Sequence, residues 1–225
     1  MKFLRLAMIA CCLLAVGCVK PATKADLFPG MYTEQPRSIL VLPPINLTTA
    51  ADAKECYITT VSEPLSHKGY YVYPAPVVME LMQIEGLYDS ELLYNADLQG
   101  IRTNLGADSV LFTKITAWDM SYMVLSSSMT VGIDCELRST LTNNVLWKHD
   151  GEVTVDLSGG SEDLIVQLIA SAVNSAMAEY VDVARRVNDI TLSTLPAGPY
   201  SQIYLQDQDE VLVDQDMWGP TGQFP

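Results

Sequence analysis

The chain of 225 residues carries 27 acidic residues against 13 Lys and Arg, a formal net charge of −14 at pH 7. This negative charge excludes nucleic acid as an expected partner, because neutralising phosphates requires clustered Lys and Arg. With 49% hydrophobic and 18% charged residues, the composition is globular and not that of a disordered chain. A chain of this length can bury one sizeable core and still carry an appendage.

The first eighteen residues, MKFLRLAMIACCLLAVGC, have the order of an export signal. Two basic residues precede an uncharged apolar run over 6–16, which is shorter than the ~20 residues of a spanning helix. Gly17 then stands directly before Cys18. This order resembles a bacterial lipoprotein signal, which implies removal of residues 1–17 and attachment of acyl chains such as palmitate to Cys18. The alternative is an ordinary secretory signal cut elsewhere, with Cys18 as a plain thiol.

The residue after the cysteine bears on the destination. In the lipoprotein class an Asp in this position is the usual signal for retention in the inner membrane, and this chain has Val19. The resemblance therefore implies the periplasmic face of the outer membrane, where several acyl chains hold a protein far more firmly than one chain does. Residues 19–37 hold three prolines and no hydrophobic period, which predicts an extended tether.

The next segment predicts a strand, a helix and a second strand. SILVLPP at 38–44 is apolar on both faces and ends in two prolines, which is typical of a buried strand. A stripe with a period of four then predicts a helix capped by Gly69, and YYVYP at 70–74 predicts the second strand. The stripe consists of Ala53, Tyr57, Val61 and Leu65. This order favours a right-handed parallel crossover.

Two short helices are expected within 76–86 and 95–108, and the hydrophobic period then changes to two. The segments 109–118, 129–141 and 143–157 predict three antiparallel strands with one dry and one wet face. The middle strand shows this most clearly, with Val131, Ile133, Cys135 and Leu137 facing one way and Asp134, Glu136 and Arg138 the other. A long amphipathic helix over 161–187 follows, with Ser161 as its N-cap.

Together these elements predict an α/β (α+β) fold in the order β-α-β-α-α-β-β-β-α, with a mixed sheet of about five strands flanked by helices in two or three layers. The expected divisions are a signal peptide over 1–17, a lipidated cysteine and tether over 18–37, a periplasmic domain over 38–188, and an acidic, irregular arm over 189–225. Whether the arm packs on its own domain is left open.

Cys56 and Cys135 are the two cysteines outside the signal. An oxidising compartment permits a disulfide between them, and two separately buried thiols are the alternative. We favour the bridge.

No pattern indicates catalysis, a metal or a cofactor. His67 and His149 are the only histidines, and neither lies at ligand spacing from a Cys or an acid. The turn SGG at 158–160 before the long helix resembles a phosphate cradle, but Glu162 and Asp163 already occupy the helix N-terminus and would repel a phosphate. We therefore expect a protein that is not an enzyme.

Two segments are candidates for contact with a partner protein. The arm carries apolar residues outside any amphipathic element, including Tyr204 and Trp218. The Met-rich stretch WDMSYMVLSSSMTV at 118–131 holds Trp118 and Tyr122 beside a predicted hairpin, and Met-rich surfaces adapt readily to partners. Core packing is the alternative for both segments.

Four stretches carry a resemblance to a known family: ILVLPPINLTTA at 39–50, PLSHKGYYVYP at 64–74, GADSVLFTKITAWDMSY at 106–122 and VLWKHDG at 145–151. They resemble an uncharacterised bacterial lipoprotein family that includes a neisserial surface-antigen lipoprotein. The resemblance covers roughly residues 18–186 and implies a fold like the N-terminal domain of TolB. One departure is Thr142–Asn143, where the family usually has Thr-Gly.

The relatives that share this fold include curli-secretion and exopolysaccharide-export lipoproteins and a lipoprotein activator of a peptidoglycan synthase. The resemblance thus implies a non-catalytic subunit of an envelope assembly, secretion or export complex, with other envelope proteins, lipoproteins among them, or further copies of itself as partners. The alternative it leaves is a regulator that activates a cell-wall enzyme. Only Cys18 carries over as a functional residue, as the lipid site.

Overall fold

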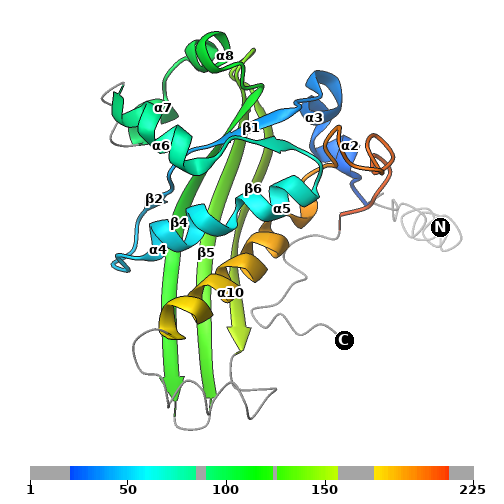
Figure 1. Ribbon diagram of the computed structural model, residues 1–225. Helices are drawn as coiled ribbons and strands as arrows, with labels where there is room; N and C mark the ends of the chain where they lie inside the picture. The colour runs from blue at the N-terminus through cyan, green and yellow to red at the C-terminus, as the bar shows by residue number, and fades with distance from the viewer. Residues whose placement is uncertain (1–20, 85–89, 124–125, 157–174, 213–225) are drawn as a thin grey trace, which may run out of the picture.

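The computed structural model describes residues 21–84, 90–123, 126–156 and 175–212 (Figure 1). A six-stranded mixed sheet lies at its centre in the order β3-β1-β4-β5-β6, with β2 also pairing with β4. The strands are β1 (Ser38–Val41), β2 (Ile45–Asn46), β3 (Tyr71–Val72), β4 (Ser109–Met123), β5 (Ser126–Ser139) and β6 (Val145–Asp156). The expected α/β class is confirmed, and the expected strands and helices follow one another as predicted, with the short strand β2 and one more helix between β3 and β4 in addition.

The parallel half of the sheet arises from the first apolar run. β1 pairs in parallel with both β3 and β4, and all four of its residues are buried, as expected for a strand that is apolar on both faces. Between β1 and β3 lie α4 (Ala53–Thr60) and α5 (Ser62–His67), where one helix was expected. The break has a local cause, because Pro64 has no N–H to donate to the carbonyl of Thr60.

The antiparallel half follows the alternating pattern. Cross-strand partners include Trp118 with Val131 and Leu111 with Leu137, all four buried in the main core. Asp134, Glu136 and Arg138 alternate with buried residues of β5 and lie half-buried on the opposite face. The predicted dry and wet faces are therefore confirmed.

Helices cover the sheet unequally. α4, α5 and α10 (Ser175–Thr191) pack over the dry face, as Figure 1 shows, and build the main core. α6 (Ala75–Ile84), α7 (Glu91–Tyr94) and α8 (Gln99–Leu105) accompany the other face only near β1, where a second core contains Leu42, Met82 and Phe112. The molecule thus has three layers beside β1 and two layers farther along β4 to β6.

The long helix is described from Ser175 onward, and the rest of the range expected for it lies outside the described residues. The final turns of α10 are fixed in the core through Ala184 and Val187. Beside them, the buried side chain of Asn188 donates a hydrogen bond to Thr60 Oγ1 (2.9 Å), which joins α10 to α4.

The expected extended tether is wrong for residues 24–34. These residues form α2 (Lys24–Leu27) and α3 (Pro29–Glu34). The helices begin for local reasons that a hydrophobic period does not reveal: Thr23 and Asp26 form a capping box, and Pro29 occupies the first turn of α3. Met31 is buried in the main core, so this segment is part of the folded domain.

The arm packs on its own domain over residues 192–212. After the short 3-10 helix η1 (Leu192–Thr194), Leu195 and Ala197 are buried, and Tyr70 donates a hydrogen bond to the carbonyl of Pro196 (2.7 Å). Gly69 makes the close contact possible, because its φ of +89° is left-handed and a Cβ there would lie 2.4 Å from Ser201 N. Residues 213–225 lie outside the described part of the chain.

The predicted disulfide is wrong, because Cys56 and Cys135 are separate, buried, free thiols. Tyr57, the residue after Cys56 in α4, places its own side chain against Cys135. Its hydroxyl lies 3.6 Å from Cys135 Sγ and 2.9 Å from Thr113 Oγ1, so a whole tyrosine side chain lies between the α4 backbone and β5. The side-chain hydrogen-bond partners of Cys135 Sγ are thus Tyr57 and Thr113, not a second sulfur.

Among the described helices, none combines the length and the apolar character that crossing a bilayer requires.

Candidate functional site

Two arrangements of charged side chains are candidates for function. The first joins the N-terminal segment to the arm, and we call it the anchor clamp: Lys24, Asp207 and Glu210. The second lies on the wet face of the sheet under α7, and we call it the cradle: Tyr94, Phe112, Lys114, Asp134, Glu136 and Lys148.

The anchor clamp surrounds a buried lysine. Lys24 Nζ lies 2.7 Å from Glu210 Oε2 and 3.5 Å from Asp207 Oδ2, and the side chains of Lys24 and Asp207 are each only 3% exposed. Asp207 also accepts hydrogen bonds from the Tyr32 hydroxyl (3.2 Å) and from Ala197 N–H (2.8 Å). A buried carboxylate with three donors is fully satisfied, so the pair holds its geometry.

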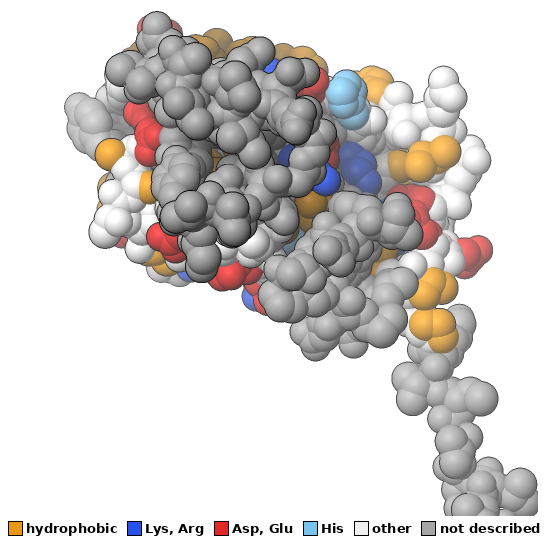
Figure 2. All heavy atoms as spheres, turned by 90° about the horizontal axis from the view of Figure 1, so that it is seen from below, with side chains coloured by type: hydrophobic (Ala, Val, Ile, Leu, Met, Phe, Trp, Pro, Cys, Tyr) orange, Lys and Arg blue, Asp and Glu red, His pale blue; other side chains and the backbone are white. Residues whose placement is uncertain are grey.

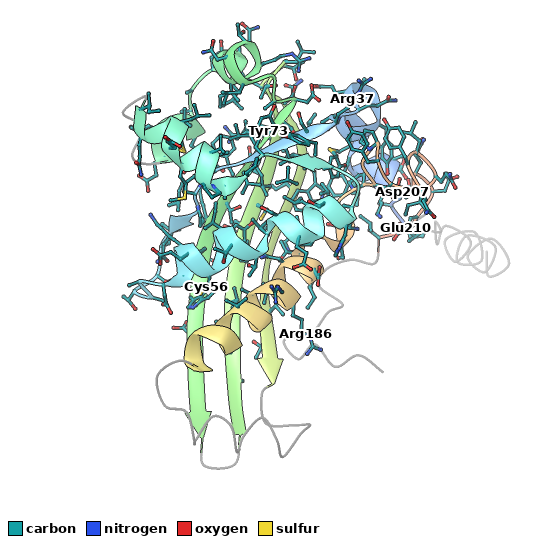
Figure 3. The ribbon with its side chains drawn as sticks, in the orientation of Figure 1. Arg37, Cys56, Tyr73, Arg186, Asp207 and Glu210 are labelled. Carbon is teal, nitrogen blue, oxygen red and sulfur yellow. The ribbon has the colours of Figure 1, made fainter. Side chains whose placement is uncertain are left out.

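The backbone reinforces the clamp. Lys24 N–H donates to the carbonyl of Glu210 (2.9 Å), Leu212 N–H donates to the carbonyl of Ala22 (3.2 Å), and Thr23 forms an antiparallel bridge with Val211. Figure 3 shows Asp207 and Glu210 on the arm, which lies beside α2. The chain is therefore part of the folded body from Ala22 onward, only four residues after Cys18.

The clamp also shifts the pKa of two neighbouring groups. Burial, followed by the negative charge of Asp207, raises the pKa of the Tyr32 hydroxyl, so this group remains a neutral donor. Burial and the charge of Lys24 lower the pKa of Lys68, whose amino group donates to the carbonyl of Ser193 (2.7 Å). These groups stabilise the junction of the two chain ends, and none of them is arranged as an acid–base pair.

The cradle results from the alternation of β4, β5 and β6. Lys114 pairs across the strands with Asp134, and Glu136 with Lys148, so that opposite charges face each other on the wet side. Tyr94 at the end of α7 lies over this surface and donates a hydrogen bond to Glu136 Oε2 (2.9 Å). The cavity between them has a volume of about 130 Å³.

Two cations contact the Tyr94 ring. Lys114 Nζ and Arg138 Cζ each lie 4.3 Å from its centroid, while Phe112 packs edge-on at 5.2 Å. Arg138 is also an ion-pair partner of Glu136. Lys114, in contrast, has no carboxylate within ion-pair distance among the residues that the structure describes.

A second hollow of about 330 Å³ adjoins the cradle and shares Tyr94 and Lys114 with it. Its other walls are Ile45, Leu47, Glu91 and Asn95. Lys114 thus lies between two hollows that are partly apolar, with Glu91 in the wall of the second.

The electrostatics of the cradle favour binding over proton transfer. Burial alone would raise the pKa of Glu136, but hydrogen bonds from Arg138 and Tyr94 and the charges of Arg138 and Lys148 outweigh it and leave the pKa lowered. Burial and the bond to Glu136 raise the pKa of Tyr94. Both groups therefore keep their ordinary charge at neutral pH. Within the described ranges, no three His, Cys, Asp or Glu side chains are grouped to hold a metal ion.

The residues expected to contact partners lie in different surroundings. Trp118 is 6% exposed in the main core, so for this residue the core-packing alternative is correct. Tyr204 is half-buried in the arm. The backbone of Tyr122 in β4 pairs with that of Ser127 in β5, but the Tyr122 side chain lies outside the description, as do Cys18 and Trp218 altogether.

Sequence reasoning missed both candidate sites. Lys24 and its partner Asp207 are 183 residues apart, and nothing local marks either of them. Lys114 did carry a signal, because it is the only charged residue within the otherwise apolar strand SVLFTKITAW. A lone lysine there indicates that one face of that strand is open to solvent.

The fold is an α/β domain of the kind found in a bacterial lipoprotein. The sequence model of the family "Putative lipoprotein GNA1162-like" matches residues 29–203, and the chain belongs to this family. The predicted resemblance is confirmed, although the match extends into the arm, beyond the range expected from the motifs.

Two neisserial comparisons support this assignment. The chain is 27% identical over 201 residues to "Putative lipoprotein NMB1124/NMB1162" of Neisseria meningitidis serogroup B (strain ATCC BAA-335 / MC58), covering 89% of this chain and 93% of that protein. The crystal structure of lipoprotein GNA1162 from Neisseria meningitidis superposes with a TM-score of 0.51 at 27% identity, covering 64% of this chain and 99% of that one. A PelC dodecamer from Paraburkholderia phytofirmans is similar at a TM-score of 0.46 and 19% identity, covering 72% of this chain and 90% of that chain.

Proposed function

We propose that this lipoprotein is a non-catalytic subunit of an envelope assembly, secretion or export complex, held at the periplasmic face of the outer membrane by acyl chains on Cys18. In this proposal the protein acts by binding. Its lipid confines it to the membrane, its clamp fixes the body next to the lipid, and its cradle receives a partner protein.

The anchor clamp is the observation that carries the proposal. An extended tether of nineteen residues would reach at most ~65 Å, but the chain is already bound to the arm at Ala22. Ala22 is the fourth residue after Cys18, and an extended chain of that length spans at most about 14 Å. A body held so close to the bilayer suits a fixed subunit of a membrane-bound assembly.

The same distance weighs against the alternative, a regulator that reaches from the outer membrane to a cell-wall enzyme. Such a regulator needs a long span, and the clamp removes most of the tether. The regulator would gain the span it needs only if the contacts of Lys24 with the arm were broken and residues 22–37 were free to extend.

The partner surface that we propose is the cradle. Lys114 is 4.3 Å from the Tyr94 ring and faces two hollows. An acidic side chain of a partner, with an apolar neighbour in the adjoining hollow, would complete it. Further copies of this chain are included among such partners, because confinement to a membrane raises the effective concentration of each copy.

Photo-crosslinking in cells tests the partner surface. A photoreactive residue at Lys114 or Lys148 should capture the same product, and the product should disappear with Cys18→Ala. The control position is Arg186, an exposed residue of α10 on the other side of the sheet (Figure 3). Equal capture at Arg186, or none at either lysine, would contradict the assignment of the cradle.

A further inference from the structure

Exposed apolar side chains gather where α2 and the arm meet. Leu27 is 49% exposed, Tyr200 71%, Ile203 54% and Val211 45%, and we call these four residues the anchor-proximal patch. Hydrogen bonds from Lys24 and Ala25 to the arm hold the two segments side by side at one end of the molecule (Figure 1). In Figure 2 hydrophobic side chains, with acidic ones between them, mark the same end.

The position of the lipid indicates what covers this patch. Thr23 is bridged to Val211, a member of the patch, and Cys18 is five residues before Thr23. Even a fully extended chain of that length reaches only about 18 Å. The part of the patch at Val211 is therefore held close to the membrane in which the acyl chains on Cys18 would lie.

The chemistry of the patch also fits a bilayer surface. Tyrosine is enriched at membrane interfaces, where its ring lies among the headgroups and its hydroxyl meets water. Tyr200 is the most exposed member of the patch, and two aliphatic side chains, Leu27 and Ile203, accompany it. The exposed acids Asp209 and Glu210 lie close by on the arm, so zwitterionic headgroups suit the patch better than anionic ones.

We infer that the anchor-proximal patch rests on the bilayer and orients the body on it, an inference that depends on the anchoring at Cys18 proposed above. The lipid then fixes the distance of the protein from the membrane, and the patch fixes which face points towards it.

Depth-dependent quenching tests this inference with the lipidated full chain. The protein is reconstituted into phosphatidylcholine–phosphatidylethanolamine vesicles that contain brominated lipid, and it carries a bimane label at Ile203→Cys or, as the matched control, at Ile84→Cys. Ile84 is 72% exposed and lies on α6, far from the arm. Labelling is selective, because Cys56 and Cys135 are 4% and 1% exposed.

We expect fractional quenching at Ile203→Cys to exceed that at Ile84→Cys at least threefold. Replacing a third of the lipid with phosphatidylglycerol should reduce the difference. Equal quenching at both positions, with the protein still floating with the vesicles, would overturn the patch but leave the anchoring intact. A chain with an intact Cys18 that fails to float would overturn both.

Discussion

At the scale of single residues, the buried lysine of the clamp has the largest expected effect on stability. Lys24→Met removes the cation but leaves Asp207 buried, so we expect the free energy of unfolding to fall by about 3 kcal/mol. Urea denaturation of the two proteins measures this difference. Lys148→Met is the control, since its ion pair with Asp150 is exposed and should contribute less than about 1 kcal/mol. Equal losses for the two variants would show that the clamp is not a buried ion pair.

The thiols give a second prediction at this scale. Burial raises the pKa of Cys135 to about 11, and burial together with Asp52 and Glu55 raises that of Cys56. Neither thiol should react with a chromogenic disulfide reagent at neutral pH in the native mature protein, and both should react after denaturation without a reductant. Absence of reactive thiols in the denatured, unreduced protein would reinstate the disulfide.

A third prediction concerns Glu136 and the dependence of the free energy of unfolding on acidic pH. Its pKa in the folded protein is lower than the ordinary value of 4.5, so its ionised form stabilises the fold above that value, and this contribution is lost as the pH falls through the lower, folded pKa. In Glu136→Gln the free energy of unfolding should therefore fall less steeply below about pH 5. Glu152→Gln, an exposed change on β6, is the control and should keep the wild-type slope. An unchanged slope in Glu136→Gln would contradict the assigned ion pair with Arg138.

At the scale of elements, the turn at Gly69 determines whether the arm can dock. Gly69→Ala forces a side chain into left-handed backbone and against Ser201, which should cost at least ~2 kcal/mol. Limited proteolysis should then cleave the arm sooner than in wild type. Gly100→Ala in α8 is the control, because a Cβ there meets no atom within 4 Å and the change should be neutral or slightly stabilising. An arm that stays protected in Gly69→Ala would contradict the packing against Ser201.

The elements also show what a sequence can predict. The strands β4 to β6 could be predicted because side chains such as Ile133 and Asp134 alternate between core and solvent. This period of two is visible in the sequence without knowledge of the fold. In contrast, α2 and α3 depend on a capping box and one proline, and the docked arm depends on Asp207, whose partner Lys24 lies at the other end of the sequence. Contacts at such separations leave no local pattern.

The same distinction applies to the candidate sites. Asp134 and Glu136 of the cradle were predicted to lie on a wet face, and they do, but nothing in the sequence of β4 indicates that Tyr94 would lie over Lys114. The disulfide prediction failed for a similar reason, since nothing in the sequence indicates that Tyr57, and not Cys56, would contact the Cys135 thiol.

At the scale of the whole molecule, the clamp joins the N-terminal segment that follows Cys18 to the arm. The folded body begins four residues after Cys18, so the lipidation that we propose there would restrict movement of the protein relative to the membrane and would present the cradle at a fixed height. Such an arrangement favours contact with neighbours in the same membrane, where many copies meet in two dimensions.

The most direct test is the native mass and composition of the protein, extracted in mild detergent after light crosslinking, for wild type and Cys18→Ala. We predict an oligomer or a recurrent set of envelope proteins with the wild type, and its loss in the variant. A monomer in both samples, with no recurrent crosslinked protein, would contradict a role as a subunit of a membrane-bound assembly.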